Sequence, residues 1–440
     1  MNEMKVPFHR AAITDEEKNA VMDVLNSLWL TTGKYALEFE KKFSEALDES
    51  LSEKTCGKGL NQLSGTEKQK PALPVVPAEK VMENRKKLNL SCDKIISLAV
   101  NSNTSGMILA MEACGVKSGK AVITTPYTFV STAACARHLG ADVYFADIEK
   151  DSYSINPEKI EEILKNDTEH KICAIVPVHI AGNICNMKKI IELAQKYSTP
   201  QNKIYVIEDS AHAFPSSTEL GFAGAIGDAG VFSFYVTKTI TTAEGGMVCT
   251  RNPELAKRMT VMRMHGMDRT TWDRYTSPKA TWEYDIVAPG YKFNLPDVLA
   301  ALGCRQVERA WLFYSQRKRI VDFYNQEFSK MDFITCPPDS LGNSWHLYII
   351  RLNLEKLKIG REEFAKKLQK EGIGISVHFI PIFHFTYWKE LYPDFTAENF
   401  PNAEEHYQKS ISIPLFPDET DAQAKFVVET IRKIGLENHA

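Results

Sequence analysis

The chain has 440 residues, of which 44% are hydrophobic and 25% are charged. This length is too great for one compact domain and suits two or three domains with a large apolar core. The formal net charge is −3, whereas nucleic-acid-binding proteins usually carry a basic excess, so we expect no nucleic-acid partner. The longest basic cluster spans residues 317–319 and predicts a solvated helix face.

Cysteine usage and the N-terminal residues indicate the compartment. The nine cysteines lie at irregular spacing, which argues against a disulfide framework and against a structural metal site, so we expect a reducing environment and no metal. The N-terminal residues MNEMKVPFHR contain no apolar signal core. No stretch approaches the roughly 18–20 apolar residues that cross a bilayer. We therefore expect a cytoplasmic protein with no membrane partner.

The first 92 residues divide into two parts. Residues 1–48 form an N-terminal helical segment, with one helix over 14–28 that Thr14 can cap and a second helix over 36–47. Residues 49–92 are polar and rich in Gly, Pro and Lys, which predicts a surface insertion that is dispensable for the chemistry. A short helix over 77–88 is expected inside this insertion.

Strands and helices alternate over residues 93–331. Short apolar runs predict strands at 95–100, 121–126, 143–147, 172–180, 204–209, 229–235 and 246–250. Helical patterns separate most of them, at 105–115, 131–139, 157–165 and 187–197. Continuously apolar strands in such an alternation predict a mostly parallel sheet covered on both faces. The last two strands are joined too tightly for a crossover helix, so the sheet is expected to be mixed.

A smaller α+β domain is predicted over residues 332–440, after a long helical region at 296–331. The pattern predicts strands at 346–352 and 375–381 and helices at 361–372 and 421–434. The fold class is therefore α/β, with a large domain at 93–331 and a smaller C-terminal domain.

Two charged residues stand where ligands of α/β sheets bind, near the carboxyl ends of strands. Asp209 ends an apolar run, where it either caps the next turn or partners a buried cation such as a protonated pyridine ring. Lys238 lies in a threonine-rich loop, where a lysine is usually solvated. Ser233 precedes it by five residues. A hydroxyl, a carboxylate and an amine are the groups that pyridoxal phosphate (PLP) requires.

A phosphate and a ring would need further contacts. Residues 101–107 (NSNTSGM) are small and polar and lead into a helix, which is the composition of an anion site at a helix N-terminus. Phe129 follows the next strand, where it either packs in the core or contacts a cofactor. Each signal is weak alone, but their combination in this order along the chain is far more specific for a PLP site.

In this order the chain resembles the DegT/DnrJ/StrS nucleotide-sugar aminotransferases, which are fold type I PLP-dependent enzymes. The resemblance covers nearly the whole chain except 49–92 and is most specific over 227–248. The matching stretches are WLTTG (29–33), NTSGM (103–107), PYTFVSTA (126–133), VPVHIAGN (176–183), IEDSAHA (207–213), GDAGVFSFYVTKTITTAEGGMV (227–248), MRMHG (262–266), PGYKFNLPD (289–297), GISVHFIP (374–381) and ISIPLFP (411–417).

The resemblance implies a role for each cofactor-binding residue. Lys238 matches the lysine that binds PLP as an imine, and Asp209 matches the partner of the pyridine nitrogen. His212 lies at the position near the phenolic oxygen, and Phe129 at the position that stacks on the ring. The phosphate contacts are implied to be Thr104, Ser105 and Ser233.

The resemblance also implies a homodimer with shared active sites. Asn294 matches a phosphate contact that the other subunit contributes, although packing within its own chain is the alternative. Trp29, Thr31 and His378 are candidates for the sugar side of the cleft, with ordinary packing again as the alternative.

The sequence departs from the family pattern at three positions. Asn103 stands where the family commonly has Gly, and we expect the turn to survive because Asn tolerates unusual backbone angles. Ser105 replaces a plain alanine, which could add a hydroxyl to the phosphate site. Ala243 stands where the family usually has Gly. None of these changes removes a catalytic group.

The implied activity is transfer of an amino group from L-glutamate to a nucleotide-linked 4-keto sugar. A PLP-dependent sugar dehydratase is disfavoured, because those relatives replace the imine lysine with histidine and this chain has Lys238. A 3-keto sugar or a keto-inositol as acceptor stays open. A non-catalytic regulator that binds PLP or a nucleotide sugar is disfavoured by the intact set of cofactor-binding groups.

Overall fold

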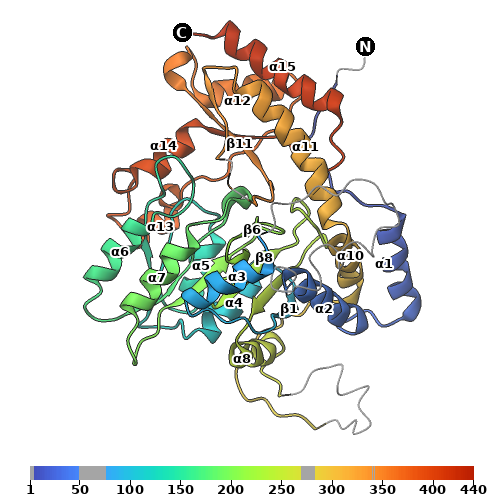
Figure 1. The fold of residues 1–440 in the computed structure, drawn as a ribbon, viewed down its shortest axis with the longest axis vertical. Helices are drawn as coiled ribbons and strands as arrows, with labels where there is room; N and C mark the ends of the chain where they lie inside the picture. Colours follow the sequence, from blue (N-terminus) through green and yellow to red (C-terminus); the bar gives the residue numbers. More distant parts are fainter. Residues whose placement is uncertain (1–3, 49–75, 269–282, 339, 341) are drawn as a thin grey trace.

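The computed structural model describes residues 4–48, 76–268, 283–338, 340 and 342–440. In Figure 1 the α/β part of the chain occupies the lower half of the view, and most of the C-terminal elements form a smaller body above it. Residues 382–403 pack against the large part instead. The long helix α11 (Ala310–Phe328) runs between the two. The predicted α/β class with a smaller C-terminal α+β unit is confirmed.

A seven-stranded mixed sheet organises the large part. Its order is β1-β9-β8-β5-β4-β2-β3, and β9 is antiparallel to both of its neighbours while the other pairs are parallel. The predicted mixed sheet is therefore confirmed. The strands are Ile96–Val100 (β1), Ala121–Thr124 (β2), Asp142–Phe145 (β3), Ile172–Ile175 (β4), Tyr205–Asp209 (β5), Ala229–Ser233 (β8) and Gly246–Thr250 (β9). A short hairpin of Ser217–Thr218 (β6) and Gly221–Phe222 (β7) was not predicted.

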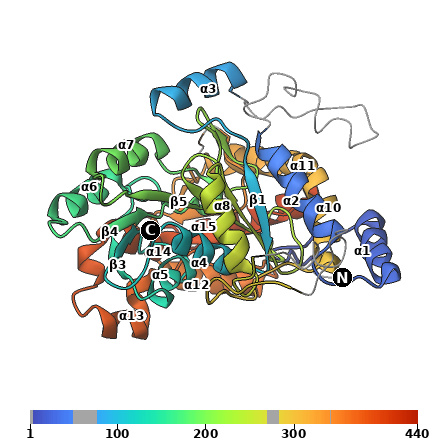
Figure 2. The same ribbon diagram turned by 90° about the horizontal axis from the view of Figure 1, so that it is seen from below.

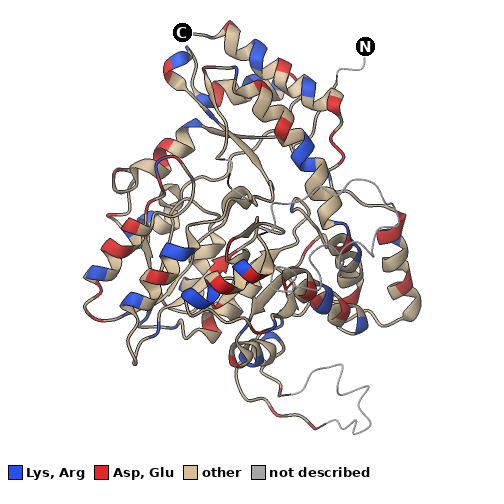
Figure 3. Cartoon of the chain, in the orientation of Figure 1, with Lys and Arg blue, Asp and Glu red and all other residues tan. Residues whose placement is uncertain are grey.

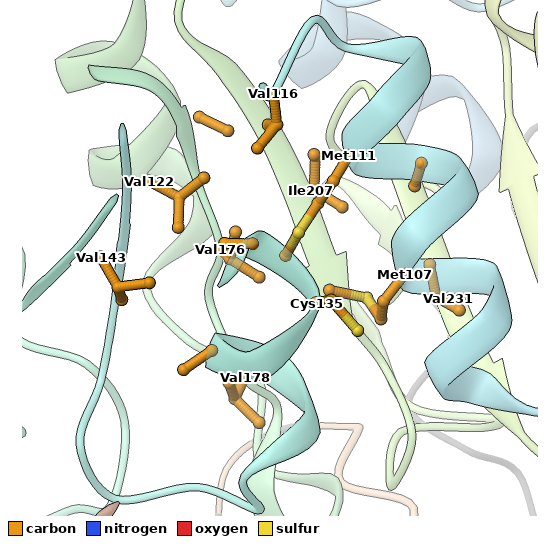
Figure 4. Close-up of a cluster of buried hydrophobic side chains, with 14 of the residues drawn as sticks. Met107, Met111, Val116, Val122, Cys135, Val143, Val176, Val178, Ile207 and Val231 are labelled. Carbon is orange, nitrogen blue, oxygen red and sulfur yellow. The ribbon is translucent and has the colours of Figure 1, made fainter. Parts of the chain in front are cut away.

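Apolar side chains of the strands are buried because helices cover the sheet. Met107 and Met111 of α4 (Asn103–Ala113) lie over Ile207 of β5 and Val231 of β8 (Figure 4). This burial on the sheet explains why the strands are apolar at successive positions rather than alternating. The other covering helices are α5 (Ser131–His138), α6 (Pro157–Asn166), α7 (Met187–Tyr197) and α8 (Pro253–Arg263).

The N-terminal helices pack beside α10 (Asp297–Glu308). Helix α1 (Asp15–Ser27) begins with the predicted cap at Thr14, where Thr14 and Glu17 form a capping box. Helix α2 (Lys34–Asp48) is capped from a distance, because Asp297 accepts hydrogen bonds from the backbone of Gly33 at 2.7 Å and Ala36 at 3.0 Å. Both α1 and α2 contact α10.

The predicted insertion at 49–92 contains a packed helix. Residues 49–75 lie outside the described residues. Helix α3 (Ala78–Lys87) lies along the outer side of the large part (Figure 2), and its Arg85 is only 2% exposed. Arg85 donates hydrogen bonds to the backbone oxygens of Ser91, Leu220 and Ala225. Helix α3 is therefore not a solvated segment, and its removal would leave buried carbonyl groups without donors. That the insertion is dispensable for the chemistry stays a prediction.

The C-terminal part is built on a three-stranded antiparallel sheet in the order β10-β11-β12. A strand at 375–381 was predicted, and this is wrong: Ser376 makes one bridge to Ser412, and Val377, His378 and Phe379 line a cavity instead of a ladder. The elements are Ile334–Thr335 (β10), Tyr348–Leu352 (β11), Ser410–Ile413 (β12), Arg361–Lys370 (α12), Thr386–Leu391 (α13), Pro401–Lys409 (α14) and Asp421–Glu437 (α15).

The basic cluster on α11 also differs from its prediction. Lys318 and Arg319 are partly exposed and form ion pairs with Asp322 and Asp421, but Arg317 is fully buried. Helix α11 packs its later turns into the C-terminal core, through residues such as Tyr324 and Phe328. Its first turns contact the large part instead, so one helix joins the two cores. The domain boundary near residue 332 stays a prediction.

Positions of basic and acidic residues are interspersed along the outer helices (Figure 3). In the part of the chain that the structure describes, no helix is both long and apolar enough to cross a membrane.

Candidate active site

One cavity of about 500 Å³ lies where the large part meets the C-terminal part. Polar residues that follow β1, β5 and β8 line it on one side, and His346 and residues 377–379 line it on the other. Of the predicted site residues, those that line this cavity are Thr104, Phe129, Asp209, His212, Ser233, Lys238 and His378. Those that do not line it are Trp29, Thr31, Ser105 and Asn294.

The Asp209 carboxylate is 4% exposed and has hydrogen-bond donors on both oxygens. Oδ2 accepts from Thr132 Oγ1 at 2.7 Å, and Oδ1 accepts from the Ala211 backbone at 3.2 Å and from Asn103 Nδ2 at 3.4 Å. Burial raises the pKa of Asp209, while Lys238 and His179 lower it. Asp209 thus caps the next turn and also faces the cavity, so the two interpretations of this residue are compatible.

Lys238 lies in the turn that follows β8, with its backbone nitrogen bonded to Tyr235 O at 2.9 Å. Burial lowers the pKa of the Lys238 amine to about 8, and the Asp209 carboxylate acts in the opposite direction. A lysine in this state is partly neutral near pH 8 and can act as a nucleophile or a base. Lys238 is therefore not the solvated surface lysine that a loop position alone would suggest.

Three histidines gather near Lys238. Burial, aided by Lys238, lowers the pKa of His212 and His346 well below the usual value and that of His378 to about 3. His212 Nδ1 accepts a hydrogen bond from the Ala181 backbone at 3.2 Å, so its proton is on Nε2, where it can be donated. His346, whose ring lies 4.4 Å from that of His212, was not singled out from the sequence.

Contacts between the two parts of the chain position His378 and Phe129. His378 Nδ1 lies 2.8 Å from Ser412 Oγ, and the His378 carbonyl accepts from Tyr127 Oη at 2.8 Å. Phe129 is 59% exposed and lies at the rim, 6.3 Å from the ring of Phe379. Its exposure excludes the alternative that Phe129 packs in the core.

The N-terminus of α4 supplies an anion cradle next to Lys238. Ser102, Asn103 and Thr104 line the cavity together with Ser233. A Cβ on Gly246 would lie 2.6 Å from the carbonyl carbon of Ser102, so only glycine allows β9 to approach this turn. Backbone N–H groups at a helix N-terminus favour a phosphate.

The three departures from the family pattern have different outcomes. Asn103 begins α4 with no positive φ; its amide instead bonds to Val231 O at 3.1 Å and to Asp209. Ser105 turns away from the cavity, with its Oγ 2.5 Å from Asn101 Oδ1 and 2.8 Å from Ser102 Oγ. Ala243 has a φ of 67°, the left-handed region that glycine adopts at least cost.

The loops that carry Trp29, Thr31 and Asn294 are joined to each other outside this cavity. Asn294 Nδ2 donates to Thr32 Oγ1 at 2.6 Å, and Thr32 Oγ1 donates to Leu295 O at 2.7 Å. Thr31 is exposed, and Trp29 is half-buried. The two loops thus form one unit that does not line the cavity of its own chain.

Together, the residues fit a phosphorylated aromatic aldehyde. An amine, a buried carboxylate and a neutral imidazole face one space, and the α4 cradle stands beside them. Gly245, which also lines the cavity, has no room for a Cβ, because the Thr242 hydroxyl would lie 2.2 Å from it.

Comparisons with known proteins agree with this geometry. A sequence profile of the DegT/DnrJ/EryC1/StrS aminotransferase family matches residues 80–432. An uncharacterized protein of Methanocaldococcus jannaschii is 35% identical over 440 residues, which is 100% of both chains. The spore coat polysaccharide biosynthesis protein SpsC of Bacillus subtilis is 33% identical and covers 98% of this chain and 97% of its own.

Solved structures of sugar aminotransferases also resemble this chain. A putative sugar aminotransferase of Streptococcus pneumoniae in its PMP form has a TM-score of 0.80 at 27% identity, covering 98% of this chain and 99% of its own. PseC of Helicobacter pylori, an aminotransferase, has a TM-score of 0.78 at 25% identity. The match covers 99% of this chain and 100% of the PseC chain. The predicted family, enzyme class and PLP cofactor are confirmed, and the chain belongs to the DegT/DnrJ/EryC1/StrS aminotransferase family.

Proposed function

We propose that the protein transfers an amino group from L-glutamate to a nucleotide-linked 4-keto sugar, in the biosynthesis of a polysaccharide or an amino sugar. The observation that carries the proposal is the joint presence of partly buried Lys238 and buried Asp209 in one cavity beside the α4 cradle. The relatives support the sugar as acceptor: SpsC acts in spore coat polysaccharide biosynthesis, and PseC is an aminotransferase in pseudaminic acid biosynthesis.

Each residue of the cavity has a role toward the cofactor in this proposal. Lys238 would attach it covalently, Asp209 would pair with the pyridine nitrogen, and His212 would donate Nε2–H to the phenolic oxygen. Phe129 covers the ring. The phosphate is held at the α4 N-terminus, with the contributing residues Thr104, Ser105 and Ser233. Ser105 would contribute through Ser102, since its backbone N–H donates to Ser102 Oγ and its hydroxyl is directed toward Asn101. When bound, PLP supplies an electron sink for the substrate carbon.

Lys238 and Asp209 act together on protons. The Lys238 amine would take the proton from the donor's α-carbon, because its lowered pKa leaves it partly neutral. Burial raises the pKa of Asp209, and a cationic pyridinium beside it would restore the carboxylate. The same amine returns a proton to the acceptor carbon when the amino group is passed on.

The assembly that we propose is a homodimer in which each site uses both chains. Asn294 and the WLTTG loop form one unit outside the cavity of their own chain. In a two-fold dimer such a unit can face the neighbour's phosphate cradle. Tyr235 and Val236, beside Lys238, are 45% and 39% exposed and offer apolar surface to the partner.

The first prediction concerns the pH dependence of Lys238. In the cofactor-free protein the amine should become reactive with a midpoint near pH 8, because burial destabilises the ammonium form. D209N should lower the midpoint further, since the Asp209 carboxylate favours the charged amine. Labelling with an amine-reactive reagent and quantifying Lys238 by mass spectrometry measures both. A midpoint at the ordinary lysine value would contradict the buried environment.

The second prediction concerns the reaction. The purified protein with PLP and L-glutamate should aminate a nucleotide-linked 4-keto sugar and release 2-oxoglutarate in equal amount. A panel of 4-keto sugars, 3-keto sugars and a keto-inositol, followed by mass spectrometry, identifies the acceptor. K238A should abolish turnover. Amination of only 3-keto substrates would correct the keto position, and no conversion across the panel would favour a regulator that binds without catalysis.

The third prediction tests the shared sites by complementation. K238A and N294A should each be severely impaired, and activity should return when they are mixed under exchange conditions. One site of the heterodimer then collects both defects and the other has neither. K238A mixed with D209N is the matched control, and it should stay inactive because both residues belong to one chain's cavity. No recovery with N294A, once exchange is confirmed, would assign Asn294 to its own subunit.

A further inference from the structure

A buried cation behind Lys238 has no role in the proposed chemistry. Arg317 of α11 is fully buried, and its Nη1 lies 3.5 Å from the carbonyl of Thr239, the residue after Lys238. Within the described residues, Arg317 Nε and Nη2 have no hydrogen-bond partner and Arg317 forms no ion pair. Leaving such donors unpaired is costly, so a group that accepts from them is expected.

Arg317 lines a small cavity of about 10 Å³ that Lys238 also lines. His9, Thr241 and Gln306 share its wall. Lys238 therefore separates this space from the active-site cavity, with which it is also in contact. A volume on the order of 10–15 Å³ holds one water molecule, provided that two to four polar groups bind it.

His9 decides which ligand suits this cavity. Its Nε2 is buried without a partner among the described residues, while the backbone of Val236 lies near the ring and acts to raise its pKa. Burial and Arg317 lower the pKa of His9 to about 4, so the ring is neutral and offers Nε2 as an acceptor. Thr241 and Gln306 already have partners. The ligand must accept from a guanidinium and donate to an imidazole, which water does and chloride does not.

We propose that Arg317 and His9 bind one internal water, and that Arg317 is thereby a positioning residue for the turn that carries Lys238. The water would connect Arg317 of α11 to His9, which in turn lies near the backbone of Val236, before Lys238 in the turn. The hydrogen bond from Arg317 to the Thr239 carbonyl holds the turn after Lys238. The consequence for the reaction depends on the proposed function of Lys238. The water site and the order of the turn do not depend on that proposed function.

The test compares R317M with K318M. Methionine keeps much of the length of Arg317 but removes the charge and the donors, and Lys318 is the next residue on the same helix with its charge toward solvent. Hydrogen–deuterium exchange is measured on the cofactor-free protein, over a peptide that spans 235–242. R317M should exchange faster in this peptide and at an unchanged rate in β4, whereas K318M should match the parent protein in both.

Two further measurements complete the test. In the loaded enzyme, R317M should lower kcat by about 10-fold or more with KM for glutamate unchanged, because misplacing a catalytic amine affects the reaction more than binding. A high-resolution crystal structure should show water within hydrogen-bond distance of Arg317 and His9 Nε2. Unchanged exchange at 235–242, or a bromide peak at Arg317 after soaking, would overturn the proposal. If no acceptor is ever aminated, the exchange and crystallographic results still decide it.

Discussion

The active site depends on keeping a buried carboxylate and a partly buried amine at the same cavity. Asp209 is 4% exposed and Lys238 is partly buried, and burial disfavours the charged form of each. Neither group is fully solvated in its charged form. Each can therefore be stabilised by a ligand that brings complementary chemistry. A ring that carries a basic nitrogen and an aldehyde meets both requirements at once.

The fold supplies this arrangement through the sheet. β5 and β8 are adjacent and parallel, so Asp209 and the turn after Ser233 emerge at the same edge. Helix α4 starts at that edge as well, and Gly246 allows the close approach of β9 to its first turn. The C-terminal part contributes His346 and residues 377–379 from the opposite side. The cavity thus lies between two separately packed cores, which α11 connects.

The strands and the groups of the cavity that follow them could be predicted from sequence, because each rests on a local pattern. The apolar runs predict the strands. Asp209 and Lys238 lie near the carboxyl ends of these strands, where ligand-binding residues are expected. Contacts that join distant segments left no such signal. Thr132 bonds to Asp209 across 77 residues, and nothing in its local sequence shows this. Arg317 looked like one of three solvated basic residues, because a run of charges does not reveal which face of a helix is buried.

The error at 375–381 has a similar origin. The run ISVHFIP has the composition of a strand, but a strand also needs a partner along its length, and here only Ser376 pairs, with Ser412. The residues after it serve the cavity, where His378 and Phe379 meet His212. Local propensity was overridden by tertiary packing, as is common for short apolar segments. At Asn103, by contrast, the backbone is ordinary and the side chain holds Asp209.

The central claim is that Lys238 is the residue that holds the cofactor. Reducing the PLP-loaded protein with borohydride fixes the covalent link, and peptide mapping then locates it. If Lys238 holds the cofactor, the visible absorption band is lost and a pyridoxyl group appears on the peptide that contains Lys238. A pyridoxyl group on another lysine, or none after reduction of fully loaded protein, would contradict it.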